Sequence, residues 1–91
     1  MLPLVWHDEA LDDLESIVDF IETQNPPAAD RIGTAIRHVG DSLPNHPYMH
    51  RPGRVPGTRE AIVTPNYILV YRVGIDAIEI LAIKHTRQQY P

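Results

Sequence analysis

The segment that decides the fold is NYILVYRV, at residues 66–73. Within it, YILVY at 67–71 is an almost continuous apolar run. Such a run is typical of a strand with little exposure on either face. We therefore expect residues 66–73 to form a central strand of a β-sheet.

Two further strand-like runs flank this segment. REAIVT at 59–64 precedes it across the turn residues of 65–66, and AIEILAI at 77–83 follows it after the tripeptide GID at 74–76. Both junctions are short enough for hairpins. The second half of the chain therefore predicts a three-strand antiparallel meander.

The first half begins with a short apolar run, residues 2–6, in which Pro3 suits a strand start or an edge strand. Asp8 is then expected to cap a helix over residues 8–24. Apolar residues recur there at spacings of three and four, which predicts one apolar stripe along the helix. The residues of this stripe are Ala10, Leu11, Leu14, Ile17, Val18 and Ile21.

A second helix is predicted over residues 27–43, with Asn25 as its cap and Pro44 beyond its end. Gly33 and Gly40 within it are expected to permit close packing of one helix on the other. Two helices joined by a few residues form an antiparallel hairpin. The residues that follow, PNHPYMHRPGRVPG, predict a loop folded back over the core by Tyr48, Met49 and Val55.

This order of elements predicts an α+β fold in two layers. An N-terminal strand precedes an antiparallel helical hairpin, which packs on a small, mainly antiparallel sheet. A chain of 91 residues has room for one hydrophobic core, so we expect a single domain over residues 1–91.

Charge is distributed unevenly along the chain, whose net charge is −4. Residues 1–30 contain acids and no Lys or Arg, whereas residues 51–91 contain an excess of bases. An anion-binding surface is therefore expected toward the C-terminus. The acidic total argues against binding of bulk nucleic acid, because that affinity grows with the number of neutralised phosphates.

Several classes of protein are disfavoured. The chain contains no cysteine, its N-terminus lacks the basic region of a signal peptide, and no apolar run approaches the roughly 20 residues of a membrane span. We therefore expect a cytoplasmic protein. We expect no metal site and no cofactor: the histidines have no ligand spacing on one helix face, and no glycine-rich phosphate loop is present.

The candidate site lies near the C-terminus, in AIKHTRQQYP. Five residues could serve there: Arg59, Lys84, His85, Arg87 and Tyr90. If they converged, they could cleave RNA without a metal, with His85 moving protons and the cations stabilising the phosphate. The alternative is a solvated polar tail, which these residue types favour when they are considered without further context.

The motifs GTRE, PNYILVYRV, IEILAIKH and the terminal R..YP, with A..DL..I..FI and NP.AA in the first half, resemble the RelE/ParE family of bacterial toxins. This resemblance spans essentially the whole chain. It implies a growth-inhibiting toxin of a type II toxin–antitoxin system, neutralised by a cognate antitoxin that covers apolar grooves. RelE-like members cut mRNA in the ribosomal A site, whereas ParE-like members inhibit DNA gyrase without a nuclease site.

Two departures from the RelE pattern favour the ParE-like activity. Ile68 stands where RelE has an arginine, and HPYMHRPGRVPG lacks the lysines of the corresponding RelE segment. His85, Arg87 and Tyr90 still match residue types of the nucleases. Gyrase inhibition is therefore the first hypothesis, ribosome-dependent mRNA cleavage the second, and an inactive antitoxin-binding module the third. No catalytic residue is assigned, and the five candidates are expected to contact the target.

Overall fold

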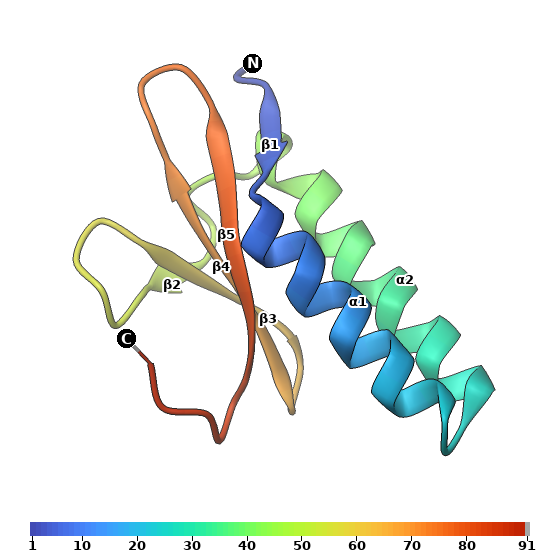
Figure 1. Ribbon diagram of the computed structural model, residues 1–91. Helices are drawn as coiled ribbons and strands as arrows, with labels where there is room; N and C mark the ends of the chain where they lie inside the picture. Colours follow the sequence, from blue (N-terminus) through green and yellow to red (C-terminus); the bar gives the residue numbers. More distant parts are fainter. Residues whose placement is uncertain (91) are drawn as a thin grey trace.

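The computed structural model describes residues 1–90 and has two helices packed on one face of a five-stranded mixed sheet (Figure 1). The sheet order is β1-β5-β4-β3-β2. The elements, in chain order, are β1 (Leu4–Trp6), α1 (Asp8–Glu22), α2 (Pro26–Ser42), the 3-10 helix η1 (Leu43–Asn45), β2 (Arg51–Pro52), β3 (Arg59–Thr64), β4 (Tyr67–Val73) and β5 (Ile78–His85). The predicted α+β, two-layer arrangement is confirmed.

The strand β4 is central, as its sequence predicts. It pairs antiparallel with β3 on one side and with β5 on the other. Residues 68–71 are all buried because alternate side chains face the helices and the opposite face of the sheet, and both faces are covered at this point. The apolar run is therefore explained by cover on two sides.

The strand β1 lies at the sheet edge and pairs parallel to β5. The backbone N–H of Ile78 donates to the carbonyl of Pro3, and that of His7 donates to the carbonyl of Ile80. Pro3 thus contributes an acceptor and needs no donor, which is why proline is tolerated at this edge.

The N-cap residue of α2 is the one that the sequence predicted, whereas the N-cap residue of α1 is different. The Asn25 side chain accepts from the N–H of Ala28 at 3.1 Å and caps α2, as predicted. His7 is the N-cap residue of α1, so the prediction of Asp8 as the cap was wrong by one position. Asp8 lies in the first turn instead, where a carboxylate favours the positive end of the helix dipole.

The two glycines of α2 have different neighbours. A Cβ on Gly33 would lie 3.1 Å from Val18 on α1, which agrees with close helix–helix packing. A Cβ on Gly40 would lie 2.5 Å from the Trp6 ring and 2.9 Å from Ile80. Gly40 therefore permits α2 to approach the sheet, and its expected role in helix–helix packing is corrected.

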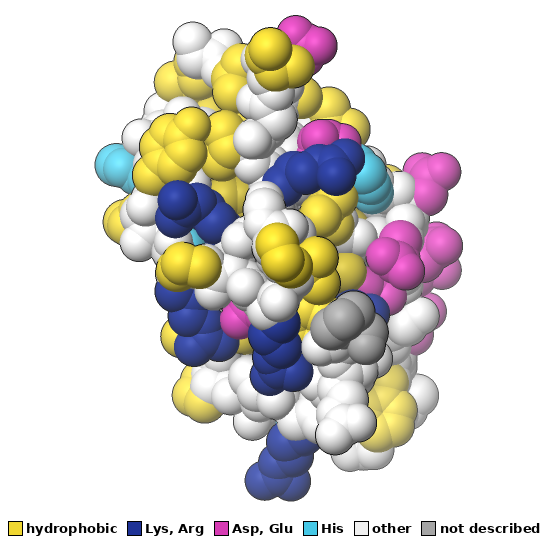
Figure 2. Space-filling view, turned by 90° about the vertical axis from the view of Figure 1, so that its left-hand side faces the viewer, with side chains coloured by type: hydrophobic (Ala, Val, Ile, Leu, Met, Phe, Trp, Pro, Cys, Tyr) yellow, Lys and Arg dark blue, Asp and Glu magenta, His cyan; other side chains and the backbone are white. Residues whose placement is uncertain are grey.

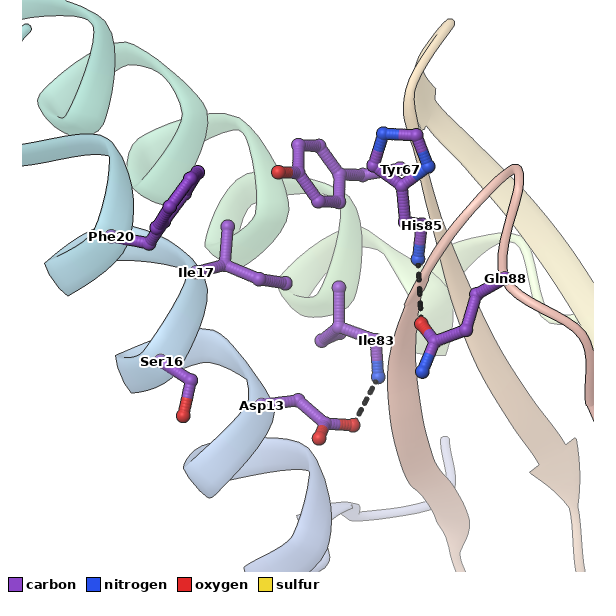
Figure 3. A pocket seen from close by; sticks show the side chains of 8 residues that line it. All are labelled: Asp13, Ser16, Ile17, Phe20, Tyr67, Ile83, His85 and Gln88. Atoms are coloured by element: carbon purple, nitrogen blue, oxygen red, sulfur yellow. Dashed lines mark hydrogen bonds between the residues drawn. The ribbon is translucent and has the colours of Figure 1, made fainter. Parts of the chain in front are cut away.

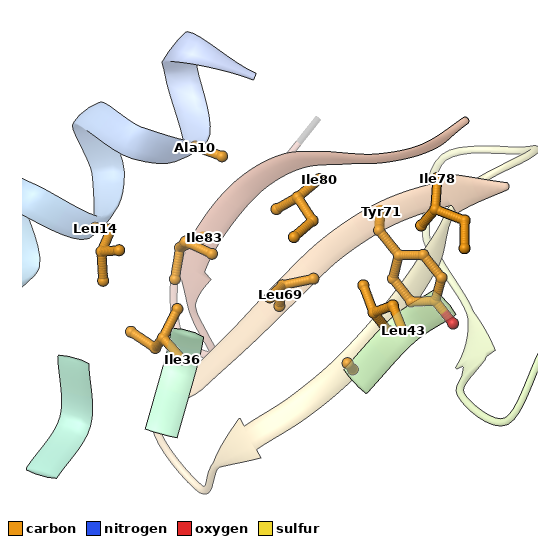
Figure 4. Packing of buried hydrophobic residues seen from close by; sticks show 10 residues of the cluster. Ala10, Leu14, Ile36, Leu43, Leu69, Tyr71, Ile78, Ile80 and Ile83 are labelled. Atoms are coloured by element: carbon orange, nitrogen blue, oxygen red, sulfur yellow. The ribbon is translucent and has the colours of Figure 1, made fainter. Parts of the chain in front are cut away.

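The core lies between the hairpin and the sheet (Figure 4). Its largest fully buried side chain is Tyr71, whose hydroxyl donates to the carbonyl of Pro47 at 2.7 Å. This bond anchors the segment after α2, which contains η1 and the short strand β2 where the sequence predicted only a loop. Tyr48 and Met49 are 67% and 65% exposed, so the prediction that they fold back over the core was wrong.

An ion-pair network joins β4, β5 and the start of α1, and it predicts a pH dependence of stability. Arg72 donates two hydrogen bonds to Glu79, at 2.8 and 3.0 Å, and His7 lies 2.9 Å from the same carboxylate. The Arg72 bonds, and then the His7 bond, lower the pKa of Glu79 from 4.5 to about 2. Because the folded pKa is depressed, this stabilisation is complete above pH 4.5 and is lost as the pH falls toward 2.

We therefore expect the urea midpoint of the wild-type protein to fall between pH 4.5 and pH 2. Arg72→Gln should show a smaller fall, because its Glu79 has lost the main cause of the shift. Arg31→Gln, an exposed arginine of α2, is the control and should behave as wild type. Equal falls in all three proteins would contradict the assignment.

Candidate functional site

A cleft of about 280 Å³ lies between α1 and the end of β5 (Figure 3). Its apolar walls are Ile17 and Phe20 from α1 and Tyr67 and Ile83 from the sheet. Asp13, Ser16, His85 and Gln88 supply its polar atoms. The cleft is thus an apolar depression with a polar rim, at the place where the candidate His85 lies.

The cleft exists because β5 is longer than its neighbour β1. The chain leaves β1 at Trp6 and enters α1, whereas β5 continues to His85. The backbone N–H of Ile83 therefore has no strand partner on this edge, and the Asp13 carboxylate accepts from it at 2.9 Å (Figure 3). The Gln88 side chain accepts from the N–H of His85 at 3.2 Å. Side-chain oxygens thus accept the hydrogen bonds of backbone N–H groups that have no neighbouring strand at this edge of the sheet.

Lys84 and His85 are the last residues of β5, so the expected end of the strand at residue 83 is corrected. The His85 ring packs edge-on against Tyr67, with the ring centroids 5.3 Å apart. Its Nδ1 accepts from the backbone N–H of Arg87 at 3.0 Å. In the neutral ring the proton therefore lies on Nε2, which leaves His85 as a hydrogen-bond donor.

The residues after β5 turn back across the face of the sheet that the helices leave uncovered. Tyr90 packs there on the buried cluster of Ile68, Val70 and Ala82. The Arg54 guanidinium lies 4.8 Å from the centroid of the Tyr90 ring and donates to the carbonyl of Gln88 at 3.4 Å. Tyr90 therefore anchors residues 86–90, termed the tail, and its buried hydroxyl has no hydrogen-bond partner among residues 1–90.

Arg59 lies elsewhere. It pairs with Tyr71, while His85 pairs with Tyr67, so the two are separated by about 13 Å along the strands and by the width of β4 across them. The Arg59 Nη1 donates to the carbonyl of His50 at 2.7 Å, and its guanidinium lies 5.1 Å from the Tyr48 ring centroid. Its guanidinium is thus held against residues 48–50.

The surroundings of Arg59 affect two neighbouring groups. Burial, and then the charge of Arg59, lower the pKa of His50. Burial raises the pKa of Tyr71, against the opposing effect of Arg59. Both pKa shifts favour the neutral form of the group concerned.

The five candidates are therefore distributed over three places. His85 and the Arg87 backbone are in contact at the cleft, Tyr90 lies on the uncovered face of the sheet, and Arg59 lies beside residues 48–50. Lys84 pairs with Ile68, so its side chain belongs to the uncovered face as well. Asp13, Phe20 and Tyr67 were not predicted as cleft residues, because their meeting depends on how α1 crosses β5.

Charge is separated over the surface of the molecule. Lys and Arg side chains gather on the face seen in Figure 2, and Asp and Glu side chains lie toward its right-hand side. Along α1 the exposed acids are Asp8, Glu9, Asp12, Glu15, Asp19 and Glu22. The face that carries the tail is thus the basic side of an acidic protein, termed the basic face.

Neither a membrane span nor a metal site is found among the residues that the structure describes. No helix among residues 1–90 is long and apolar enough to cross a membrane. Within the same residues, no group of three or more His, Asp or Glu side chains could hold a metal ion.

The described residues thus form a small α+β domain with an apolar cleft on one side and a basic face on another. The family model described as "ParE toxin of type II toxin-antitoxin system, parDE" matches residues 4–90. The chain therefore belongs to the ParE toxin family of type II toxin–antitoxin systems.

Individual relatives support this family assignment. A protein of Sinorhizobium fredii named Y4kP is 39% identical over 94% of this chain and 90% of its own length. Toxin RelE2 of Caulobacter vibrioides is 34% identical over 93% of this chain and 96% of its own length. The chromosomal ParDE system of P. aeruginosa contains a chain that superimposes with a TM-score of 0.85 at 27% identity, covering 93% of this chain and 96% of that one.

Proposed function

We propose that this toxin inhibits DNA gyrase by binding to it and that a cognate antitoxin neutralises the toxin in the cytoplasm. The observation that carries the proposal is the dispersal of the groups that RNA cleavage would need. Arg59 is held at residues 48–50, away from His85. RNA cleavage requires a proton carrier and phosphate-binding cations that all lie within hydrogen-bond reach of the same scissile phosphate group.

The position of Ile68 supports the same proposal. RelE, which this sequence resembles, has an arginine there, whereas Ile68 is 1% exposed and lies under Tyr90. An apolar residue in this place packs the tail onto the sheet and cannot stabilise a phosphate. This departure from the RelE pattern therefore supports a toxin that binds its target without cutting RNA.

The basic face is the surface that suits this target. Lys84 and Arg87 lie at the end of β5 and in the tail, and neither side chain makes a hydrogen bond or an ion pair within residues 1–90. Free cations on one face favour an anionic partner and steer its approach. We propose that Lys84, Arg87 and Tyr90 contact the gyrase–DNA complex, while Arg59 supports residues 48–50 at a separate place on the toxin.

The cleft suits the antitoxin. Phe20 is 64% exposed, and the apolar cleft that it borders is also lined by Ile17, Tyr67 and Ile83. A volume of about 280 Å³ accommodates one large apolar side chain. We propose that the antitoxin inserts such a side chain here. Polar groups of the antitoxin next to that side chain would contact Asp13 and Gln88.

A ribosome-dependent mRNA endonuclease is the second candidate. The observation that favours it is the 34% identity to a protein named Toxin RelE2. His85 would then transfer protons through Nε2 as base or acid, and Arg87 would bind the phosphate; Arg59, the second cation expected there, would have to leave residues 48–50. An inactive antitoxin-binding module is separated from both candidates by growth after induction without antitoxin.

One preparation of toxin, assayed for both activities, tests the proposal. We expect inhibition of supercoiling by purified gyrase and no codon-positioned cuts in mRNA from expressing cells, read by primer extension. His85→Ala should leave gyrase inhibition within about twofold of wild type, because the ring is not a proton carrier in this activity. Under the nuclease hypothesis the same substitution would reduce cutting by roughly 100-fold or more.

Two results would overturn gyrase inhibition: full supercoiling activity at a large excess of folded toxin, or mRNA cuts that disappear in His85→Ala. Circular dichroism of the variant provides the control for folding. Normal growth with folded toxin present would favour the inactive module.

A further inference from the structure

A second depression, of about 330 Å³, lies where the β2–β3 hairpin meets the segment after η1. The loop of this hairpin, residues 53–58, projects away from both helices (Figure 1). The depression is termed the arginine pocket. Its lining residues come from the segment after η1, from the hairpin and from the end of β4, and they are Tyr48, Pro52, Gly57, Thr58, Arg59 and Val73.

The arginine pocket lies apart from the cleft and from the tail. Arg59 pairs with Tyr71, and residues that pair directly across two strands share one face of the sheet. Tyr71 belongs to the core under the helices, whereas Tyr90 packs on the opposite face. No cleft residue among residues 1–90 also lines the arginine pocket. The pocket can therefore be occupied independently of the cleft and of the tail.

The arginine pocket is cationic. Arg59 is half-buried, and among the described residues it is the one Lys, Arg, Asp or Glu that lines the pocket. It belongs to no ion pair within residues 1–90. A half-buried cation without an acidic partner attracts anions, because partial burial weakens the screening of its charge by water. The pocket therefore favours an anionic ligand, although the net charge of the protein is −4.

The guanidinium of Arg59 is held in place and retains free donors. Its Nη1 donates to the carbonyl of His50 at 2.7 Å and to that of Tyr48 at 3.4 Å. Its Nε and Nη2 donate to no group within residues 1–90. These two nitrogens form a planar fork that matches two oxygens of a carboxylate or a phosphate. Because the guanidinium is already fixed, an oxyanion that binds to it loses little affinity to side-chain ordering.

The walls beside Arg59 are apolar. The ring of Tyr48, which is 67% exposed, lies with its centroid 5.1 Å from the guanidinium, and Pro52 and Val73 add aliphatic surface. A bare phosphate or acetate ion would leave much of the pocket to water, whose share of liquid volume is about 30 Å³ per molecule. An aromatic ring can pack on Tyr48 and displace that water. The ligand that fits the pocket is therefore an oxyanion carried by an aromatic ring.

We propose that the arginine pocket binds an aromatic oxyanion, which is a carboxylate or a phosphate monoester attached to an aromatic ring. Nε and Nη2 of Arg59 donate to two of its oxygens, and its ring packs between Tyr48 and Val73. This binding goes beyond the action on gyrase proposed above and does not depend on it.

Small probes separate the contribution of the charge from that of the ring. Phenyl phosphate and benzoate carry both features, benzyl alcohol carries the ring alone, and inorganic phosphate and acetate carry the charge alone. Each probe is titrated into the wild-type protein at constant ionic strength, so that screening is the same throughout. Binding is followed by amide chemical shifts in NMR.

We expect phenyl phosphate or benzoate to shift the amides of residues 57–59 and 73 saturably. At least one of these two probes should bind about tenfold more tightly, or better, than benzyl alcohol, inorganic phosphate and acetate. The tighter of the two then shows whether the pocket is built for a phosphate or for a carboxylate.

Two substitutions test the assigned contacts. Arg59→Lys keeps the charge but removes the fork, and it should weaken binding about tenfold. Tyr48→Ser removes the ring from an exposed position and should weaken binding by a similar factor. Arg31→Gln, an exposed arginine of α2, is the control and should bind as wild type. Circular dichroism checks folding, and Tyr48→Ser alone decides if Arg59→Lys does not fold.

Four results would overturn the proposal. Equally tight binding of benzyl alcohol would show that the ring binds without the charge, and equally tight binding of inorganic phosphate or acetate would indicate an adventitious ion only. Chemical-shift changes at Lys84 and Arg87 in place of residues 57–59 would assign the probes to the basic face. Unchanged affinity in the folded variants, or no shift at probe concentrations up to solubility, would exclude a site in the arginine pocket.

Discussion

Replacing Lys84 and Arg87 together by glutamate is expected to weaken the inhibition of gyrase supercoiling by about tenfold or more. Both side chains lie at the end of β5 or in the tail and make no hydrogen bond or ion pair within residues 1–90. Exposed charge pairs contribute about 0.2–1 kcal/mol each, and reversal replaces attraction by repulsion. Two reversals therefore amount to about 0.8–4 kcal/mol, a range that includes the roughly 1.4 kcal/mol of a factor of ten.

The matched control reverses two exposed arginines of α2, Arg31 and Arg37. Both double variants carry the same net charge, so a general effect of charge would appear in both. We expect the α2 variant to inhibit gyrase as wild type does. Similar losses in the two variants would remove the basic face from the mechanism, and a wild-type protein without activity would instead refute gyrase as the target.

The substitution Gly40→Ala is expected to lower the free energy of unfolding by about 2 kcal/mol. The added Cβ would lie 2.5 Å from the Trp6 ring and 2.9 Å from Ile80. Either α2 moves away from the sheet or the indole ring leaves its position, and both changes loosen the core. The higher helix propensity of alanine offsets at most about 1 kcal/mol of this loss.

Gly33→Ala provides the comparison within the same helix. A Cβ there would lie 3.1 Å from Val18 and 3.2 Å from the guanidinium end of Arg37, which can move. We expect its unfolding free energy to be unchanged or raised by up to about 1 kcal/mol. Urea unfolding followed by circular dichroism measures both, and Trp6 fluorescence should change only in Gly40→Ala. Equal destabilisation of the two variants would show that α2 is not packed more tightly against Trp6 at Gly40 than against α1 at Gly33.

Much of the fold could be predicted because local signals and tertiary context agree. The apolar run at 67–71 is the central strand, Asn25 caps α2, and Pro3 lies at a sheet edge. The errors arose where distant segments meet. The parallel pairing of β1 with β5, the short strand β2 and the contact of Gly40 with Trp6 all join residues far apart in the sequence.

The candidate site was less predictable than the fold. The sequence identified the residue types near the C-terminus, but it did not indicate that Tyr90 would pack on Ile68 and be covered by Arg54. The cleft was not anticipated, because Phe20 lies outside the periodic apolar stripe of α1. An exposed apolar residue beyond such a stripe is the signal that could have identified it.

The sequence by itself determined the order of elements, the central strand and the membership in a toxin family, since these depend on periodicity, turn residues and motif order. The tertiary structure decided which C-terminal side chains share a surface. A bulge at Leu81 shifts the register between β4 and β5, so that Tyr71 pairs with Ile80 but Val70 pairs with Ala82. Because side chains alternate along a strand, this one-residue shift reverses the facing of every residue after it. His85 therefore faces the helices at the cleft and Lys84 faces the basic side, a separation that depends on pairing between strands.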